Sequence, residues 1–332
     1  MSILVTGGAG YIGSHTVKQL REKGYEVVVY DSIEDGHEEA VFDTTLVVGS
    51  ILDEIKLDET IKKYKIEDVI HFAAYSIVGE SIVCPQKYYR NNVLGTLSLL
   101  DSMIRNNIKK IVFSSTAAVY GEPERLPIVE ESCKNPTNVY GKTKLMIENI
   151  MEDYHKAYGL QYVSLRYFNA SGADPSGLIG EDHHPETHLI PIIFETLLGK
   201  REYLSIFGTD YNTPDGTCIR DYIHVNDLGK AHILALEALS NKLDSGIYNL
   251  GNGNGFSIHE VIQSVERVTG QKVPLREEGR RVGDPAMLIA SADRAKKDLN
   301  WYPDYTKLDD IIETAWEWHR KNKWGFQRRK NK

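Results

Sequence analysis

Short apolar runs alternate with amphipathic stretches along the first half of the chain. Residues 3–5 are apolar and are followed directly by glycines, and residues 11–23 carry Ile12, Val17 and Leu20 at helical spacing. The pattern predicts further strands at 26–30, 46–48, 68–72, 110–114 and 162–166, and helices at 57–64, 88–106 and 140–158. Strands that are apolar throughout are typical of a parallel sheet covered by helices on both faces.

The pattern therefore predicts an α/β fold, with a doubly wound parallel sheet of the Rossmann type in residues 1–170. The composition changes after Asn169, where residues 171–191 are rich in Gly, Pro, Asp and His. Shorter helices are expected beyond it, at 188–198, 226–239, 258–269 and 308–319. We expect residues 171–332 to form a second, smaller α/β lobe, with part of 223–250 able to return to the first domain.

The composition excludes several classes of protein. With 41% hydrophobic and 26% charged residues among 332, the chain is typical of a globular protein and not of a disordered chain or a coiled coil. Its 47 acidic and 39 basic side chains give a net charge of −8, which argues against a nucleic-acid partner or an anionic membrane surface. We therefore expect the partner to be a small molecule.

The lack of a recognisable targeting signal and the spacing of the cysteines lead us to expect a cytoplasmic protein. No stretch of 18 apolar residues is present, and no basic leader precedes the first apolar run, so we expect neither a membrane span nor a signal peptide. Cys84, Cys133 and Cys218 are widely spaced and lack the pairing typical of a zinc site or a disulfide framework. A reducing compartment fits this cysteine usage.

A glycine-rich turn joins the first expected strand to the first expected helix. Gly7 allows a tight turn, Gly10 allows the backbone to approach a pyrophosphate closely, and Gly13 allows the helix to pack on the strand. Asp31 follows the second strand 18 residues past Gly13, near the position of an acid that binds an adenosine ribose. No basic residue follows within 32–36, which favours NAD over NADP. The alternative is a structural glycine turn beside a surface carboxylate.

A tyrosine and a lysine lie four residues apart in the segment expected to form the 140–158 helix. Tyr140 and Lys144 therefore share one helix face. A phenol is a poor base at neutral pH, and we expect the lysine ammonium, together with the positive ring of a bound nicotinamide, to lower its pKa. Thr116 follows the 110–114 strand and can hydrogen-bond the same reacting oxygen. Taken alone, a Tyr-x-x-x-Lys pair is usually a solvated helix face.

Beyond these two motifs, five longer blocks resemble the nucleotide-sugar 4-epimerases of the extended short-chain dehydrogenase/reductase family over nearly the whole chain. The blocks are Val69-Ile70-His71-Phe72-Ala73-Ala74, Tyr88-Tyr89-Arg90-Asn91-Asn92-Val93, Leu165-Arg166-Tyr167-Phe168-Asn169, Asp215-Gly216-Thr217-Cys218-Ile219-Arg220-Asp221-Tyr222-Ile223-His224-Val225, and Tyr248-Asn249-Leu250-Gly251.

The resemblance implies three sets of site residues. The catalytic set is Tyr140, Lys144 and Thr116. The NAD contacts are Gly7, Gly10, Tyr11, Ile12, Gly13, Asp31, Ser32, Ser50, Ile51, Phe72, Ala73, Ala74, Ser76, Asn91, Thr116, Tyr140, Lys144 and Phe168. The UDP-sugar contacts are Thr116, Tyr140, Asn169, His188, Leu189, Ser205, Phe207, Arg220, Tyr222, Arg281, Asp284 and Leu288.

The resemblance also implies the reaction. Tyr140 takes the proton from the sugar 4-OH as hydride leaves C4 for NAD, and hydride returns to the opposite face of the 4-keto sugar. UDP-galactose and UDP-glucose are the expected pair, in galactose metabolism. In similar enzymes a tyrosine at the position of Leu288 excludes N-acetylated sugars and a small residue admits them. Leucine is intermediate in size, so a UDP-N-acetylhexosamine substrate stays open. A UDP-hexuronate substrate stays open as well. The family is usually dimeric through two helices, here 88–106 and 140–158, so we expect a homodimer.

Other chemistries fit less well. The related dehydratases carry Asp-Glu after the threonine, whereas Ala117 and Ala118 exchange no proton. A non-catalytic NAD-sensing module is the alternative from another class, and it has no need of Tyr140 and Lys144. Residues 181–188 have a metal-like composition, but Pro185 interrupts any helix that would align two of the histidines, so we expect a polar loop and no metal.

Several positions depart from the family's pattern. Ser50 stands where an Asp often holds the adenine amine, and Ser76 replaces a lysine near the nicotinamide ribose. His188 stands where many members have Asn, and Thr116 keeps the hydroxyl of a usual serine.

Overall fold

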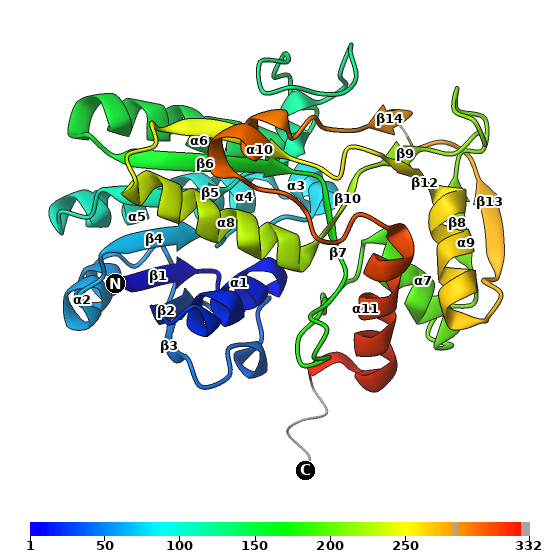
Figure 1. Ribbon diagram of the computed structural model, residues 1–332, viewed down its shortest axis with the longest axis horizontal. Coiled ribbons are helices and arrows are strands. Elements are labelled where there is room, and N and C mark those ends of the chain that lie inside the picture. The colour runs from blue at the N-terminus through cyan, green and yellow to red at the C-terminus, as the bar shows by residue number, and fades with distance from the viewer. Residues whose placement is uncertain (282–283, 327–332) are drawn as a thin grey trace.

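A seven-stranded parallel sheet forms the larger part of the computed structural model, which describes residues 1–281 and 284–326 (Figure 1). Its strand order is β11-β6-β5-β4-β1-β2-β3, and every neighbouring pair runs parallel. The strands are β1 (Ser2–Thr6), β2 (Glu26–Asp31), β3 (Thr45–Val48), β4 (Asp68–His71), β5 (Lys110–Ser114), β6 (Gln161–Tyr167) and β11 (Gly246–Leu250). The expected doubly wound α/β fold is confirmed.

Helices cover both faces of this sheet, which explains why its strands are apolar throughout. Ile3 and Val5 belong to one buried cluster and Leu4, between them, to another, and all three are fully buried. The first cluster includes residues of α1 (Tyr11–Glu22), α8 (Val225–Ser240) and α10 (Asp293–Leu299). The second includes residues of α2 (Glu54–Tyr64), α5 (Gly95–Arg105) and α6 (Val139–Tyr158).

The chain passes between the two lobes more than once. After β7 (Asn169–Ser171) it enters the smaller lobe, and β10 (Tyr222–His224), paired with β7, leads it back. There α8 packs beside α1, and β11 joins the sheet edge beside β6. Residues 225–250 are therefore part of the larger lobe.

The smaller lobe has its own core, built by three helices and a short sheet on the right of Figure 1. These are α7 (Leu189–Leu197), α9 (Ile258–Thr269), α11 (Leu308–Lys321), β8 (Leu204–Phe207) and β13 (Leu275–Glu278). The remaining short elements are η1 (Glu38–Ala40), α3 (Val78–Val83), α4 (Pro85–Tyr88), the π-helical η2 (Tyr89–Leu94), η3 (Ala117–Tyr120), β9 (Ile219–Arg220), β12 (Phe256–Ser257) and β14 (Met287–Leu288).

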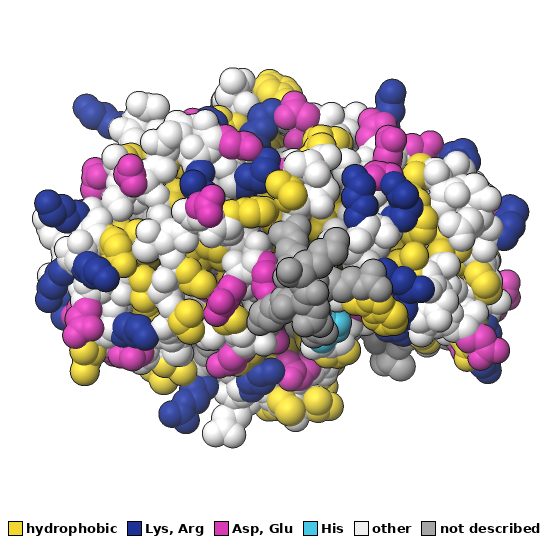
Figure 2. All heavy atoms as spheres, turned by 90° about the horizontal axis from the view of Figure 1, so that it is seen from below, with side chains coloured by type: hydrophobic (Ala, Val, Ile, Leu, Met, Phe, Trp, Pro, Cys, Tyr) yellow, Lys and Arg dark blue, Asp and Glu magenta, His cyan; other side chains and the backbone are white. Residues whose placement is uncertain are grey.

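The surface shows no broad field of one charge on the face drawn in Figure 2, where Lys and Arg side chains are interspersed with Asp and Glu. Within residues 1–281 and 284–326, no helix is both long enough and apolar enough to cross a membrane.

Candidate active site

The turn after β1 is as tight as the glycine pattern requires. Gly7 has φ +71°, and a Cβ there would lie 2.5 Å from the backbone nitrogen of Ala73. A Cβ on Gly13 would lie 2.2 Å from the carbonyl oxygen of Gly7, so α1 approaches β1 only because no side chain intervenes. Gly10 caps α1 without a side-chain hydrogen bond, which leaves the first N–H groups of the helix available to an anion.

Asp31 is held in place by this turn. One carboxylate oxygen accepts a hydrogen bond from the N–H of Ala9 at 2.9 Å, and the other accepts one from the N–H of Ile33 at 2.9 Å. Burial raises the pKa of Asp31, although both backbone bonds act in the opposite direction. Each oxygen keeps a lone pair for a ligand hydroxyl, so the cradle and the acid together fit a dinucleotide.

The three expected catalytic residues gather at the carboxyl ends of β5 and β6. Asn138 caps α6 by accepting a 2.8 Å hydrogen bond from the N–H of Gly141, which places Tyr140 in the first turn. Lys144, one turn later, donates a 2.7 Å hydrogen bond to the carbonyl of Ser114 and lies 5.9 Å from the centre of the Tyr140 ring. Thr116 caps η3 and hydrogen-bonds the Tyr140 phenol.

Burial dominates the acid–base behaviour of this group. Burial raises the pKa of Tyr140 to about 12, and the bond from Thr116 opposes that rise. Burial also lowers the pKa of Lys144 to about 7, against the charge of Glu148. We predicted a lowering of the Tyr140 pKa from Lys144 together with the positive ring of a bound nicotinamide; within the protein groups alone, burial dominates and the pKa of Tyr140 is raised.

A buried ion pair behind Lys144 was missed by the sequence analysis. Arg166 on β6 donates to both carboxylate oxygens of Glu148 on α6, at 2.9 and 2.6 Å, and both side chains are almost fully buried. The same carboxylate accepts a 2.6 Å bond from the Ser115 hydroxyl, and Arg166 also donates to the Tyr120 hydroxyl at 2.8 Å. Because the two residues are 18 positions apart in the sequence, no helix or strand periodicity predicts that they form a pair.

All of the expected NAD contacts line one cavity at the edge of the sheet. Asn169 and His188, expected to contact the sugar, line it as well. Other lining residues were not predicted, namely Tyr30, Glu34, Asp35, Gly36, Gly49, Tyr75, Ile77, Val78, Glu80, Ser114, Tyr167, Ala170, Glu181, His183, His184, Pro185 and Thr187. Many of them are sequence neighbours of predicted contacts, at strand ends where ligands of open α/β sheets bind.

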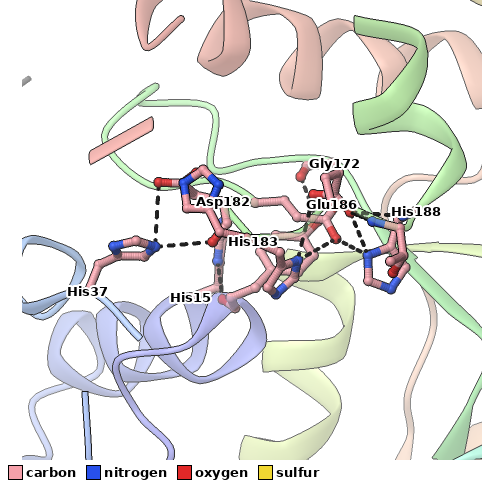
Figure 3. Close-up of polar contacts among 11 residues, drawn as sticks. His15, His37, Gly172, Asp182, His183, Glu186 and His188 are labelled. Atoms are coloured by element: carbon pink, nitrogen blue, oxygen red, sulfur yellow. Dashed lines mark hydrogen bonds and ion pairs between the residues drawn. The ribbon is translucent and has the colours of Figure 1, made fainter. Parts of the chain in front are cut away.

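Residues 181–188 form a loop against this cavity, with Glu186, His183 and His188 turned toward one another (Figure 3). His188 Nδ1 lies 2.9 Å from Glu181 Oε1 and 3.0 Å from Glu186 Oε1. Burial alone would lower the pKa of His183, but the carboxylates of Glu181 and Glu186 outweigh it and raise the value to about 9. The same two carboxylates raise the pKa of His188 against its burial. We argued against a metal because Pro185 prevents a helix that would align His184 with His188. The loop needs no helix, and it brings a different histidine, His183, close to His188.

The other expected UDP-sugar contacts lie in the smaller lobe, outside the residues that line the cavity. Arg220 on β9 pairs with Asp284, and the Arg281 guanidinium lies 3.9 Å from the centre of the Phe207 ring. Register pairs Leu288 on β14 with Arg220. Ser205 lies on β8 with Phe207, Tyr222 is buried at the start of β10, and Leu189 is the first residue of α7.

Over residues 3–251 the chain matches the NAD dependent epimerase/dehydratase family, and it belongs to that family. NAD is therefore its cofactor, as expected, and the chain is an NAD-dependent enzyme. A UDP-glucose 4-epimerase from Halalkalibacterium halodurans is 55% identical over 326 residues, which are 98% of each chain.

Solved structures agree with this placement. A UDP-glucose 4-epimerase from Brucella ovis in complex with NAD matches with a TM-score of 0.93 and 52% identity, over 95% of this chain and 97% of the other. One from Bifidobacterium longum in complex with NAD+ and UDP matches with a TM-score of 0.91 and 40% identity, over 98% of this chain and 100% of the other.

Proposed function

We propose that this chain interconverts UDP-galactose and UDP-glucose by inverting C4 of the sugar. The observation that carries the proposal is the arrangement of Tyr140, Thr116 and Lys144 on the wall of the dinucleotide cavity. The 55% identity to a UDP-glucose 4-epimerase, over almost the full length of both chains, supports this choice of substrate.

The chain's own residues handle the proton of the 4-hydroxyl. When bound, NAD supplies the hydride acceptor and donor for C4 and a positive ring charge beside the phenol. Tyr140 accepts the 4-OH proton as the 4-keto sugar forms and returns it after the sugar turns over. Thr116 hydrogen-bonds the reacting oxygen, and Lys144 adds its ammonium charge to the same site.

The uridine diphosphate group is proposed to bind at the smaller lobe, in residues 171–332 apart from 225–250 and α10. Phe207 offers a ring on which uracil can stack, and Arg220 and Arg281 offer bidentate donors for the diphosphate. These two arginines now contact Asp284 and the Phe207 ring, so the nucleotide exchanges those contacts for its own. Leu288, beside Arg220, is proposed to face the sugar.

The test is conversion of pure UDP-galactose, followed by proton NMR with and without added NAD. We expect UDP-glucose to form without added NAD, because NAD that is bound to the protein is regenerated in each cycle and need not leave. Tyr140→Phe should slow the reaction by about 10²- to 10⁴-fold. Tyr158→Phe, an exposed change on the same helix, is the control. Protein that contains NAD but leaves UDP-galactose untouched would overturn the substrate assignment.

We also propose that the enzyme is a cytoplasmic homodimer. Its three cysteines are free thiols, two of them exposed, which suits a reducing compartment. Leu94 and Met146, which lie in the two segments expected to form the interface, are 49% and 45% exposed.

A further inference from the structure

We propose that Glu181, His183, Glu186 and His188 form a binding site for one divalent transition-metal ion, with Zn²⁺ as the ion whose chemistry fits best. This proposal does not depend on the substrate proposed above. It concerns the loop at residues 181–188, which borders the cavity between the start of α1 and the start of α7.

The four ligand atoms lie close enough together to share one ion after a small rearrangement. One atom from each residue lies within 4.8 Å of all the others. His183 Nδ1 is 3.3 Å from Glu181 Oε1 and 3.7 Å from Glu186 Oε2, while His188 Nδ1 is 2.9 Å and 3.0 Å from the same two carboxylates. Ligand atoms bonded at about 2.0–2.1 Å to a tetrahedral ion lie about 3.3 Å apart, so the closer pairs already have this spacing and the pairs that lie up to 4.8 Å apart would have to move together by about 1–1.5 Å.

The burial and hydrogen bonding of these side chains provide a second observation. His183 Nδ1 is buried and makes no hydrogen bond within the described residues, although it faces two carboxylates. The side chains of Glu181 and Glu186 are only 5% and 4% exposed, so their two negative charges need a compensating charge of +2. In the absence of an ion, protonated His183 and His188 supply that charge, whereas a divalent ion bound to two neutral imidazoles supplies it from one centre.

The donor set selects the ion. Two imidazole nitrogens with two carboxylate oxygens suit Zn²⁺ and its transition-metal neighbours and disfavour Mg²⁺ and Ca²⁺, which prefer oxygen ligands. Four protein ligands close the tetrahedron, which is typical of a structural ion. The His183 ring lies edge-on to the ring of Tyr11, with centres 6.2 Å apart, so the ion would fasten this loop to the first turn of α1.

The experiment measures metal binding directly, on untagged full-length protein treated with a chelator and then desalted. Cys84 and Cys133 are exposed thiols, and thiolates are Zn²⁺ ligands, so every protein carries Cys84→Ser and Cys133→Ser. Zn²⁺ is titrated by calorimetry, and Co²⁺ reports the geometry through its visible absorption. Glu181→Gln and Glu186→Gln remove one ligand charge each without changing side-chain size. His184→Gln changes a neighbouring histidine that lies outside the four ligands.

We expect one ion per chain, a tetrahedral Co²⁺ spectrum, and affinity at least about 100-fold weaker in both glutamine variants but unchanged in His184→Gln. Mg²⁺ should not compete. Circular dichroism and retained NAD binding must show that the variants fold. Absence of stoichiometric binding would overturn the proposal. So would binding by Glu181→Gln and Glu186→Gln that is as tight as that of the protein without these changes, or loss of binding in His184→Gln.

Discussion

Lys144 shows how burial changes the chemistry of a single side chain. Its ammonium contacts the Ser114 carbonyl at 2.7 Å and lies 4.7 Å from the centre of the Phe113 ring, and the residue is 2% exposed. Burial lowers its pKa from 10.5 to about 7, with the charge of Glu148 acting against the change. A lysine in this position can lose its proton near neutral pH, so the electrostatic support of Tyr140 depends on pH.

The same shift predicts a pH-dependent stability. Between about pH 7 and the unfolded pKa of 10.5, the unfolded chain binds more protons at this site than the folded chain, so the unfolding free energy from this group rises with pH. Lys144→Met removes that slope. We therefore expect wild-type protein, freed of NAD, to gain stability relative to Lys144→Met as pH rises from about 7 to about 10. Urea unfolding at several pH values measures the difference, with exposed Lys142→Met as the control. A difference independent of pH would contradict the argument.

At the scale of elements, the approach of α1 to β1 depends on Gly13. Gly13→Ala would place a Cβ 2.2 Å from the Gly7 carbonyl oxygen and 2.9 Å from the Cα of Gly8, and because both are backbone atoms, relief would require the backbone itself to move. We expect a loss of about 1–3 kcal/mol in unfolding free energy, together with weaker NAD binding. Gly79→Ala is the matched control, since a Cβ there meets nothing within 4 Å, and it should be neutral or slightly stabilising. Calorimetry with NAD and urea unfolding test both effects.

The contact between β6 and α6 depends on the pair of Arg166 and Glu148. Arg166→Met leaves the Glu148 carboxylate buried without its cation, so we expect a cost of about 3–5 kcal/mol. The double change Arg166→Met and Glu148→Leu should cost less than the sum of the single changes, by about 1 kcal/mol or more. Urea unfolding of the full cycle measures this coupling. Lys156→Met breaks an exposed pair on the same helix and should change stability little. Additive single and double changes would show that the pair is not coupled.

Across the whole molecule, local signals and long-range contacts differ in how far they could be predicted. The sheet and the cavity followed from the sequence because Gly7, Asp31 and Thr116 each lie at or just past the end of an apolar strand, and parallel strands bring their carboxyl ends together. The Arg166–Glu148 pair and the Arg220–Asp284 pair join residues that are distant in the sequence, so neither partner indicates the other. The cluster at residues 181–188 escaped because an irregular loop has no periodicity to test.

The proposed homodimer requires an apolar surface that a second copy can cover. Exposed apolar side chains concentrate on segments that contact α6, namely α3 and η2, and on α6 itself. Ile82 and Val83 on α3 are 61% and 76% exposed, and Leu94 on η2 and Met146 on α6 are about half exposed. Isolated apolar residues are ordinary on a surface, but several on contacting elements are typical of an interface.

A dimer that buries these segments would be sensitive to charge at their exposed apolar positions. Combining Leu94→Glu with Met146→Glu places uncompensated carboxylates in the interface, and we expect the dissociation constant to rise at least about 100-fold. Light scattering at micromolar protein should then report a monomer mass, against a dimer mass for the wild type. Ile55→Glu is the control, because Ile55 is 74% exposed but lies on α2, outside the proposed interface. A monomeric wild type would remove the proposed interface. A dimer that survives the double change but is lost in Ile55→Glu would place the interface elsewhere.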